Sequence, residues 1–214
     1  MDILSDFIAA KLLKVKAVKF QIDNPFVWGI GWQSPIYCDD RKLLSYPASR
    51  AVIKLELARL IAEKYPDVEV IAGVASNAVA MSVLVADTLG LPFIYVHPEP
   101  KDHGFENRIE GDLRPHQNVV IIENQVSTGA NSVKVADAIR QNACKVQGLL
   151  SIFDYQFETA HKALAQIDLE HTSLCNYDAV IRLAVDNKII TVSDAEVLQQ
   201  WHTNPAKWQP KTGL

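Results

Sequence analysis

The fold prediction depends on the stretch Val119-Val120-Ile121-Ile122-Glu123-Asn124-Gln125-Val126-Ser127-Thr128-Gly129-Ala130-Asn131-Ser132. Its apolar start predicts a buried strand over 118–122, which ends at an acidic residue. A turn of serine, threonine and glycine then opens a predicted helix over 133–143. Backbone N–H groups and hydroxyls at a helix start can hold a phosphate, and a carboxylate beside them can accept hydrogen bonds from sugar hydroxyls. The stretch therefore predicts a ribose 5-phosphate site, although simple capping of the helix explains the turn equally well.

Strands and helices alternate on both sides of this stretch. Apolar runs predict three further strands, at 68–74, 91–96 and 146–153. Helical spacing of apolar residues predicts helices at 48–64 and 75–90. Continuous apolar strands are typical of a parallel sheet that is covered on both faces. We therefore expect an open, doubly wound, mostly parallel α/β sheet flanked by helices, with ligands at the carboxyl ends of its strands.

Both ends of the chain add structure to this predicted sheet. A helix is expected over 2–18, and short strands and turns over 25–47. Two further helices are expected in the last fifty residues. Asn176 caps the first of them, and a capping box at Ser193–Glu196 begins the second.

We expect one domain with three parts. These parts are a small N-terminal hood at roughly 1–45, a core at roughly 46–160, and C-terminal helices at roughly 161–214.

Composition excludes several classes of protein. The chain has 214 residues, of which 49% are hydrophobic and 21% charged, so it can bury a full core. A net charge of −4 disfavours a nucleic-acid partner. No apolar run approaches the roughly 20 residues that span a bilayer, so no membrane partner is expected. Three widely spaced cysteines fit a reducing cytoplasm better than a disulfide framework.

Familiar catalytic motifs are absent from the sequence. It contains no P-loop, no dinucleotide-binding glycine motif and no G-x-S-x-G nucleophile motif. Its six histidines lack the spacing of a metal site, so no metal-ligating residues are assigned.

Two other segments can carry chemistry. The polar segment 97–112 contains Lys101, His103 and Arg108, which could close over a polyanionic substrate. An exposed polar loop is the simpler interpretation. Residues 73–80 turn from strand to helix through small side chains, which suits either a diphosphate contact or close packing of a helix on the sheet.

Taken together, these segments resemble the orotate phosphoribosyltransferases of the bacterial type, from about residue 3 to residue 208. The resemblance rests on the order and spacing of five pieces. They are Gly31–Lys42 (GWQSPIYCDDRK), 73–80, Lys-Asp-His-Gly at 101–104 with Ile-Glu-Gly at 109–111, the loop 121–132, and Trp201–Pro205.

This resemblance implies a type I phosphoribosyltransferase fold and the transfer of ribose 5-phosphate from phosphoribosyl diphosphate to orotate, a step of UMP biosynthesis. It implies catalytic roles for Lys101, His103 and Glu123. The substrate-binding residues that it implies are Gln33, Tyr37, Ser76, Asn77, His97, Asn124, Ser127, Thr128, Gly129, Ala130, Asn131, Ser132 and Tyr155. It also implies Mg²⁺ bound with the diphosphate, a cytoplasmic homodimer, and a transition state in which positive charge develops on the ribose.

The sequence differs from the family pattern at several site positions. Asn124 stands where a second acid is usual, Gln33 where lysine is usual, His97 where arginine is usual, and Ala130 where glycine is usual. Tyr155-Gln156 lies where many members have an arginine. These differences leave an alternative open, namely a weakened or inactive paralogue that binds a nucleotide or phosphoribosyl ligand as a sensor or regulator.

Overall fold

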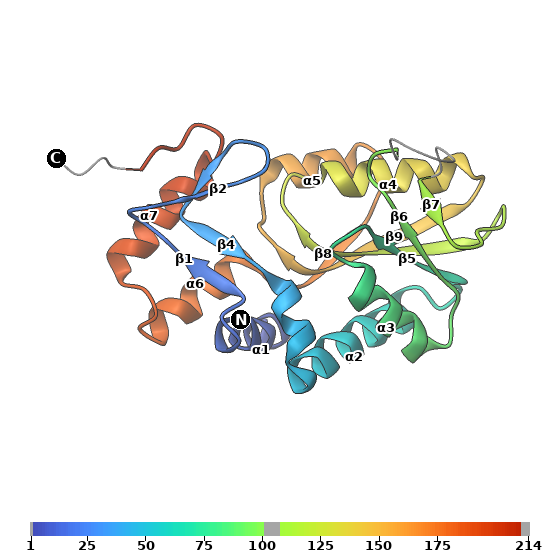
Figure 1. Ribbon diagram of the computed structural model, residues 1–214, viewed down its shortest axis with the longest axis horizontal. Coiled ribbons are helices and arrows are strands. Elements are labelled where there is room, and N and C mark those ends of the chain that lie inside the picture. Colours follow the sequence, from blue (N-terminus) through green and yellow to red (C-terminus); the bar gives the residue numbers. More distant parts are fainter. Residues whose placement is uncertain (1, 101–107, 211–214) are drawn as a thin grey trace.

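The computed structural model describes residues 2–100 and 108–210, and a six-stranded sheet lies at its centre (Figure 1). In spatial order the strands are β10 (His171–Asn176), β9 (Lys145–Asp154), β8 (Asn118–Val126), β5 (Val70–Val74), β6 (Phe93–Val96) and β7 (Ile109–Glu110). Neighbouring strands are parallel, except that β7 is antiparallel to β6. The predicted mostly parallel α/β sheet is therefore confirmed.

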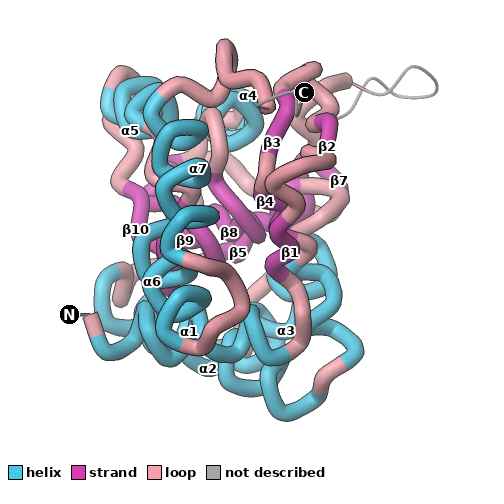
Figure 2. The backbone as a smooth tube through the Cα atoms, turned by 90° about the vertical axis from the view of Figure 1, so that its left-hand side faces the viewer, coloured by secondary structure: helices cyan, strands magenta, loops and turns pink. Residues whose placement is uncertain are grey.

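Helices cover both faces of the sheet (Figures 1 and 2). One face carries α4 (Ala130–Gln141) and α5 (Glu158–Ala165), and the other carries α1 (Ile3–Lys14), α2 (Pro47–Lys64) and α3 (Val79–Leu89). Near the amino end of β8, Val119 and Ile121 pack into the core on the α4 side, whereas Val120 and Ile122 pack into the core under α2 and α3. Both faces of β8 are thus buried, which explains its continuous apolar run.

The short strands predicted over 25–47 are present beside the C-terminal helices (Figure 1), and one strand that was not predicted, β1 (Val18–Phe20), precedes them. β1 pairs antiparallel with β4 (Ile36–Cys38), and β2 (Phe26–Val27) pairs with β3 (Gln33–Ser34). A 3₁₀ helix, η1 (Asp40–Ser45), follows β4. The last two helices are α6 (Tyr177–Asp186) and α7 (Val192–Thr203). Among the helices in the described ranges, none has the length and apolar content that crossing a bilayer requires.

Two predicted boundaries were wrong at the carboxyl ends of strands. β8 runs to Val126 instead of ending at Ile122, because its pairing with β9 continues to the partners Val126 and Asp154. α3 begins at Val79 instead of Ala75, because the intervening residues form a turn. The polar residues 123–125 therefore belong to the sheet, whereas residues 75–78 after β5 do not.

The C-terminal region contains more structure than the two predicted helices. Strand β10 and helix α5 were missed, and β10 is a mostly polar strand at the edge of the sheet with two buried residues. Asn176 caps α6 as predicted, since its side chain accepts a hydrogen bond from Ala179 N. The capping box of α7, however, pairs Thr191 with Asp194 and does not involve Ser193.

This correction can be tested with two alanine variants. Thr191→Ala removes a hydroxyl that accepts from Asp194 N at 3.1 Å, so it should lower stability by about 1 kcal/mol. For a chain of this size that corresponds to roughly 2–4 °C in melting temperature. Ser193→Ala, two residues away and exposed, is the control and should leave the melting temperature unchanged. A larger loss for Ser193→Ala would contradict the observed cap.

Candidate active site

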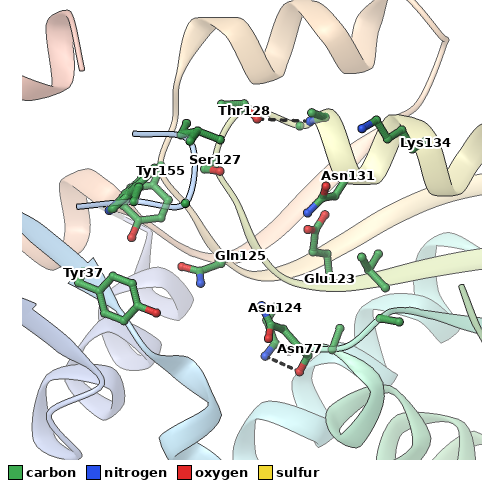
Figure 3. Close-up of a pocket in the computed structure, with 18 of the residues that line it drawn as sticks. Tyr37, Asn77, Glu123, Asn124, Gln125, Ser127, Thr128, Asn131, Lys134 and Tyr155 are labelled. Atoms are coloured by element: carbon green, nitrogen blue, oxygen red, sulfur yellow. Dashed lines mark hydrogen bonds between the residues drawn. The ribbon is translucent and has the colours of Figure 1, made fainter. Parts of the chain in front are cut away.

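A cavity of about 510 Å³ opens at the carboxyl ends of β5, β8 and β9 (Figure 3). Its wall combines the β2–β3 hairpin, the turn after β5, the end of β8, the loop into α4, and the residue after β9. The lining residues are Val27, Trp28, Gly29, Ile30, Tyr37, Val74, Ala75, Asn77, Ala78, Glu123, Asn124, Gln125, Ser127, Thr128, Gly129, Ala130, Asn131, Lys134 and Tyr155. Ten of the predicted substrate-binding and catalytic residues are in this set.

The start of α4 forms one end of the cavity. Gly129 caps the helix with a φ of +76°, a conformation that favours glycine, and Thr128 Oγ1 lies 3.5 Å from Ala130 N. A Cβ on Gly129 would also lie 3.3 Å from the Cα of Ala160 in α5. The first N–H groups of this twelve-residue helix have no partner within the helix and carry the positive end of its dipole. This end of the cavity is suited to an anion.

Glu123 lies beside this helix start and is held by a neighbouring hydroxyl. Ser132, fully buried in the first turn of α4, donates a hydrogen bond from Oγ to Glu123 Oε2. Ser132 was predicted as part of the phosphate cradle, but its side chain is directed at Glu123. Burial raises the pKa of Glu123 from 4.5 to about 7, although the Ser132 hydrogen bond acts in the opposite direction. Because this pKa is close to neutral, a charge placed near Glu123 changes the fraction of the carboxyl group that is ionised.

Asn124 is positioned by two acceptors on different elements. Its Nδ2 donates to Asp40 Oδ1 at 2.9 Å. It also donates to the backbone oxygen of Asn77 at 2.9 Å (Figure 3). Asp40, at the start of η1, is 2% exposed, and burial raises its pKa from 3.8 to about 7. Sequence reasoning missed Asp40. Its signal was a second acid in Cys38-Asp39-Asp40-Arg41, a run quoted only for its family resemblance.

Aromatic rings form the end of the cavity away from α4. Tyr155 is fully buried, and its ring meets that of Trp28 edge to face at 5.0 Å. Its hydroxyl accepts a hydrogen bond from Cys38 N at 3.2 Å. Gln125 lies between Tyr37 and Asn124 and donates from Nε2 to the Cys38 backbone oxygen at 3.3 Å (Figure 3). Trp28 and Gln125 were not predicted as site residues, although Gln125 lies within the quoted stretch 119–132.

Several predicted residues lie elsewhere. Ser76 is exposed next to the cavity, and Gln33 lies in β3, where its backbone oxygen accepts from Trp201 Nε1 at 2.9 Å. His97 pairs through its backbone N–H with the Arg108 oxygen at 2.8 Å and is not among the described lining residues. Lys101 and His103 lie outside the described residues.

The chain is 48% identical over 208 residues to an orotate phosphoribosyltransferase of Porphyromonas gingivalis, covering 97% of this chain and 99% of that protein. It is 41% identical over 199 residues to one of Bacillus anthracis, covering 93% and 95%. The chain matches no protein-family model.

Solved structures of other proteins are also similar to this chain. A crystal structure of orotate phosphoribosyltransferase from Aeropyrum pernix has a TM-score of 0.74 at 27% identity, covering 82% of this chain and 97% of that chain. A UMP synthase of Leishmania donovani shares the fold with a TM-score of 0.79 at 24% identity, covering 93% of this chain and 42% of that chain. The sheet, its helices and the position of the cavity define a type I phosphoribosyltransferase fold. The chain belongs to the orotate phosphoribosyltransferase family.

The raised pKa of Glu123 has a measurable effect on stability. Because its pKa is about 7 in the folded protein and near 4.5 when unfolded, this group contributes stability below pH 4.5 that is lost as pH rises through 7. Glu123→Gln should therefore gain stability over the wild type at pH 8 but not at pH 4.5. Since Glu123 is only partly buried, we expect a gain of about 1–2 kcal/mol.

Thermal unfolding at the two pH values measures this difference. Glu158→Gln is the matched control, because Glu158 is exposed on α5 and pairs with Lys162. Glu158→Gln should be no more stable than the wild type at pH 8. Equal melting temperatures of Glu123→Gln and the wild type at both pH values would contradict the raised pKa.

Proposed function

We propose that the protein transfers ribose 5-phosphate from phosphoribosyl diphosphate to orotate, releasing diphosphate and forming orotidine 5′-phosphate for UMP synthesis. The observation that carries this proposal is the order of groups along one cavity: a helix start, then Glu123 and Asn124, then an aromatic wall. A nucleoside monophosphate has the same order of phosphate, ribose and base. Family membership supports the same reaction.

The phosphate and the base occupy opposite ends of the cavity in this proposal. The 5-phosphate binds the N–H groups of residues 129–132 and the hydroxyls of Ser127 and Thr128. The orotate ring lies against Tyr37 and Tyr155, next to Trp28, whose ring contacts that of Tyr155. The strands around this end, within roughly residues 1–45, act as a hood over the base.

Catalysis in this proposal is mainly electrostatic. As diphosphate leaves C1, positive charge develops on the ribose, and the Glu123 carboxylate beside it stabilises that charge. Binding both substrates in one cavity also places the ring nitrogen of orotate in line with C1. Lys101 and His103 are proposed to contact the departing diphosphate, as the family resemblance implies.

Mg²⁺ is proposed to enter with phosphoribosyl diphosphate. In the described part of the chain, no three His, Cys, Asp or Glu side chains group so that they could hold a metal ion by themselves. The Glu123 carboxylate, which lines the cavity, is a ligand of the type that Mg²⁺ accepts beside substrate oxygens. Bound there, the ion would neutralise charge on the diphosphate.

The setting of the enzyme is proposed from its family and composition. All three cysteines are free and buried, which suits a reducing cytoplasm. A homodimer is proposed because the family resemblance implies one. The alternative of a sensor without turnover rests only on residues such as Asn124 and Gln33, and no comparison favours it.

Release of diphosphate tests the reaction directly. Purified protein with Mg²⁺, phosphoribosyl diphosphate and orotate should release diphosphate, whereas uracil, adenine and other bases should give far lower rates. Glu123→Gln should lower kcat by about 10²–10³ because it removes the charge beside the ribose. No release with any base would contradict the proposed function.

Ligand-induced stabilisation tests the phosphate end separately. Orotidine 5′-phosphate should raise the melting temperature with concentration, and orotidine should raise it much less. Gly129→Ala forces a side chain into a positive-φ position 3.3 Å from Ala160, so it should weaken the phosphate-dependent part. Equal shifts for the two ligands would contradict a phosphate site at α4.

A further inference from the structure

Asn124 lies at the centre of the cavity as a neutral side chain, directly after Glu123 on β8. It is 4% exposed. The amide has two N–H groups, and both are used, one on Asp40 Oδ1 and one on the Asn77 backbone oxygen. The orientation of the amide is therefore fixed. Rotation by 180° would place its oxygen against a carboxylate and a carbonyl, which costs two hydrogen bonds and adds repulsion.

The amide oxygen is left available by this arrangement. Asn124 Oδ1 is buried and has no hydrogen-bond partner among the described residues, although Asn124 lines the cavity. A buried acceptor without a partner is costly unless a ligand or water completes it. The hydroxyl groups of a ribose are donors suited to this oxygen.

Asp40 places a second carboxyl group directly behind the amide. It is 2% exposed, and its second oxygen, Oδ2, also has no partner within the described ranges. Asp40 also acts electrostatically on Glu123, whose pKa it raises. Two carboxyl groups therefore flank the Asn124 amide, the partly buried Glu123 beside it on β8 and the buried Asp40 behind it on η1. A cationic ribose in the cavity would be attracted to both.

We propose that Asp40 and Asn124 act as one unit in ribose binding. Asp40 is the positioning residue, which turns the Asn124 oxygen toward the sugar hydroxyls and supplies the negative charge that an amide lacks. The unit joins residues that are 84 positions apart in the sequence. This inference rests on the proposed function and specifies which side chains hold the ribose of phosphoribosyl diphosphate.

Three variants separate charge from orientation. Asp40→Asn keeps the shape and an acceptor for Asn124 Nδ2 but removes the charge. Asn124→Asp places two carboxyl groups where a hydrogen bond of 2.9 Å now lies and removes the donor to Asn77. The exchange variant D40N/N124D restores one charge and one donor–acceptor pair with the roles reversed. Asp39→Asn is the control, since Asp39 pairs with Arg41.

Steady-state diphosphate release gives the first readout. Asp40→Asn should lower kcat/KM for phosphoribosyl diphosphate by about tenfold or more, and Asn124→Asp by at least as much. The exchange variant should recover part of the loss, exceeding Asp40→Asn by about threefold because the donor to Asn77 is still missing, and Asp39→Asn should remain within about twofold of the wild type. Asp40→Asn at the wild-type rate, or an exchange variant that loses the product of the two single losses, would overturn the proposal.

Binding and stability give readouts independent of turnover. Asp40→Asn should weaken binding of ribose 5-phosphate but not of inorganic phosphate, because Asn124 faces the sugar and α4 holds the phosphate. Its melting temperature should not fall, since it removes a buried charge without changing volume. A fall in melting temperature with unchanged ribose 5-phosphate affinity would overturn the proposal in favour of a structural role. Wild-type protein that releases no diphosphate would contradict the proposed function instead.

Discussion

The site depends on the unequal lengths of the strands that pair with β8. β5 pairs with β8 as far as Ile122, whereas β9 pairs with it as far as Val126. Residues 123–125 therefore keep a strand conformation fixed on one side while the other side opens to the cavity. Because the connections run in opposite directions from β5 and β8, this is also the point where the topology of the sheet leaves a crevice. Glu123, Asn124 and Gln125 are held there by the sheet and not by a loop.

Much of the fold could be predicted because its strands are buried on both faces. Continuous apolar runs such as 68–74 and 146–153 leave few alternatives to strands of a covered parallel sheet. Prediction failed for a strand that is only partly buried, and for a helix start where two neighbouring polar residues could each act as the cap. β10 is mostly polar, and Thr191 and Ser193 are both acceptable helix caps, so only the geometry of the chain distinguishes them.

Some residues of the candidate site could likewise be predicted from the sequence, and others could not. The loop after β8 is contiguous, so Ser127, Thr128 and Gly129 could be recognised from local chemistry. Asp40 and Trp28 reach the site through long-range packing, which no spacing in the sequence encodes. The substitution of an amide for an acid at Asn124 cannot be interpreted from its own position, because its effect depends on a carboxyl group on another element.

The hairpin over the aromatic end of the cavity is supported by the last helix of the chain. Trp201 of α7 donates to the Gln33 backbone oxygen, and its ring meets that of Trp28 at 5.7 Å. His202 lies 2.6 Å from the Tyr155 backbone oxygen. During synthesis on the ribosome the chain emerges from its N-terminus, so the hairpin is made first and its support last. The aromatic end of the cavity therefore gains the support of Trp201 and His202 only after α7 has left the ribosome.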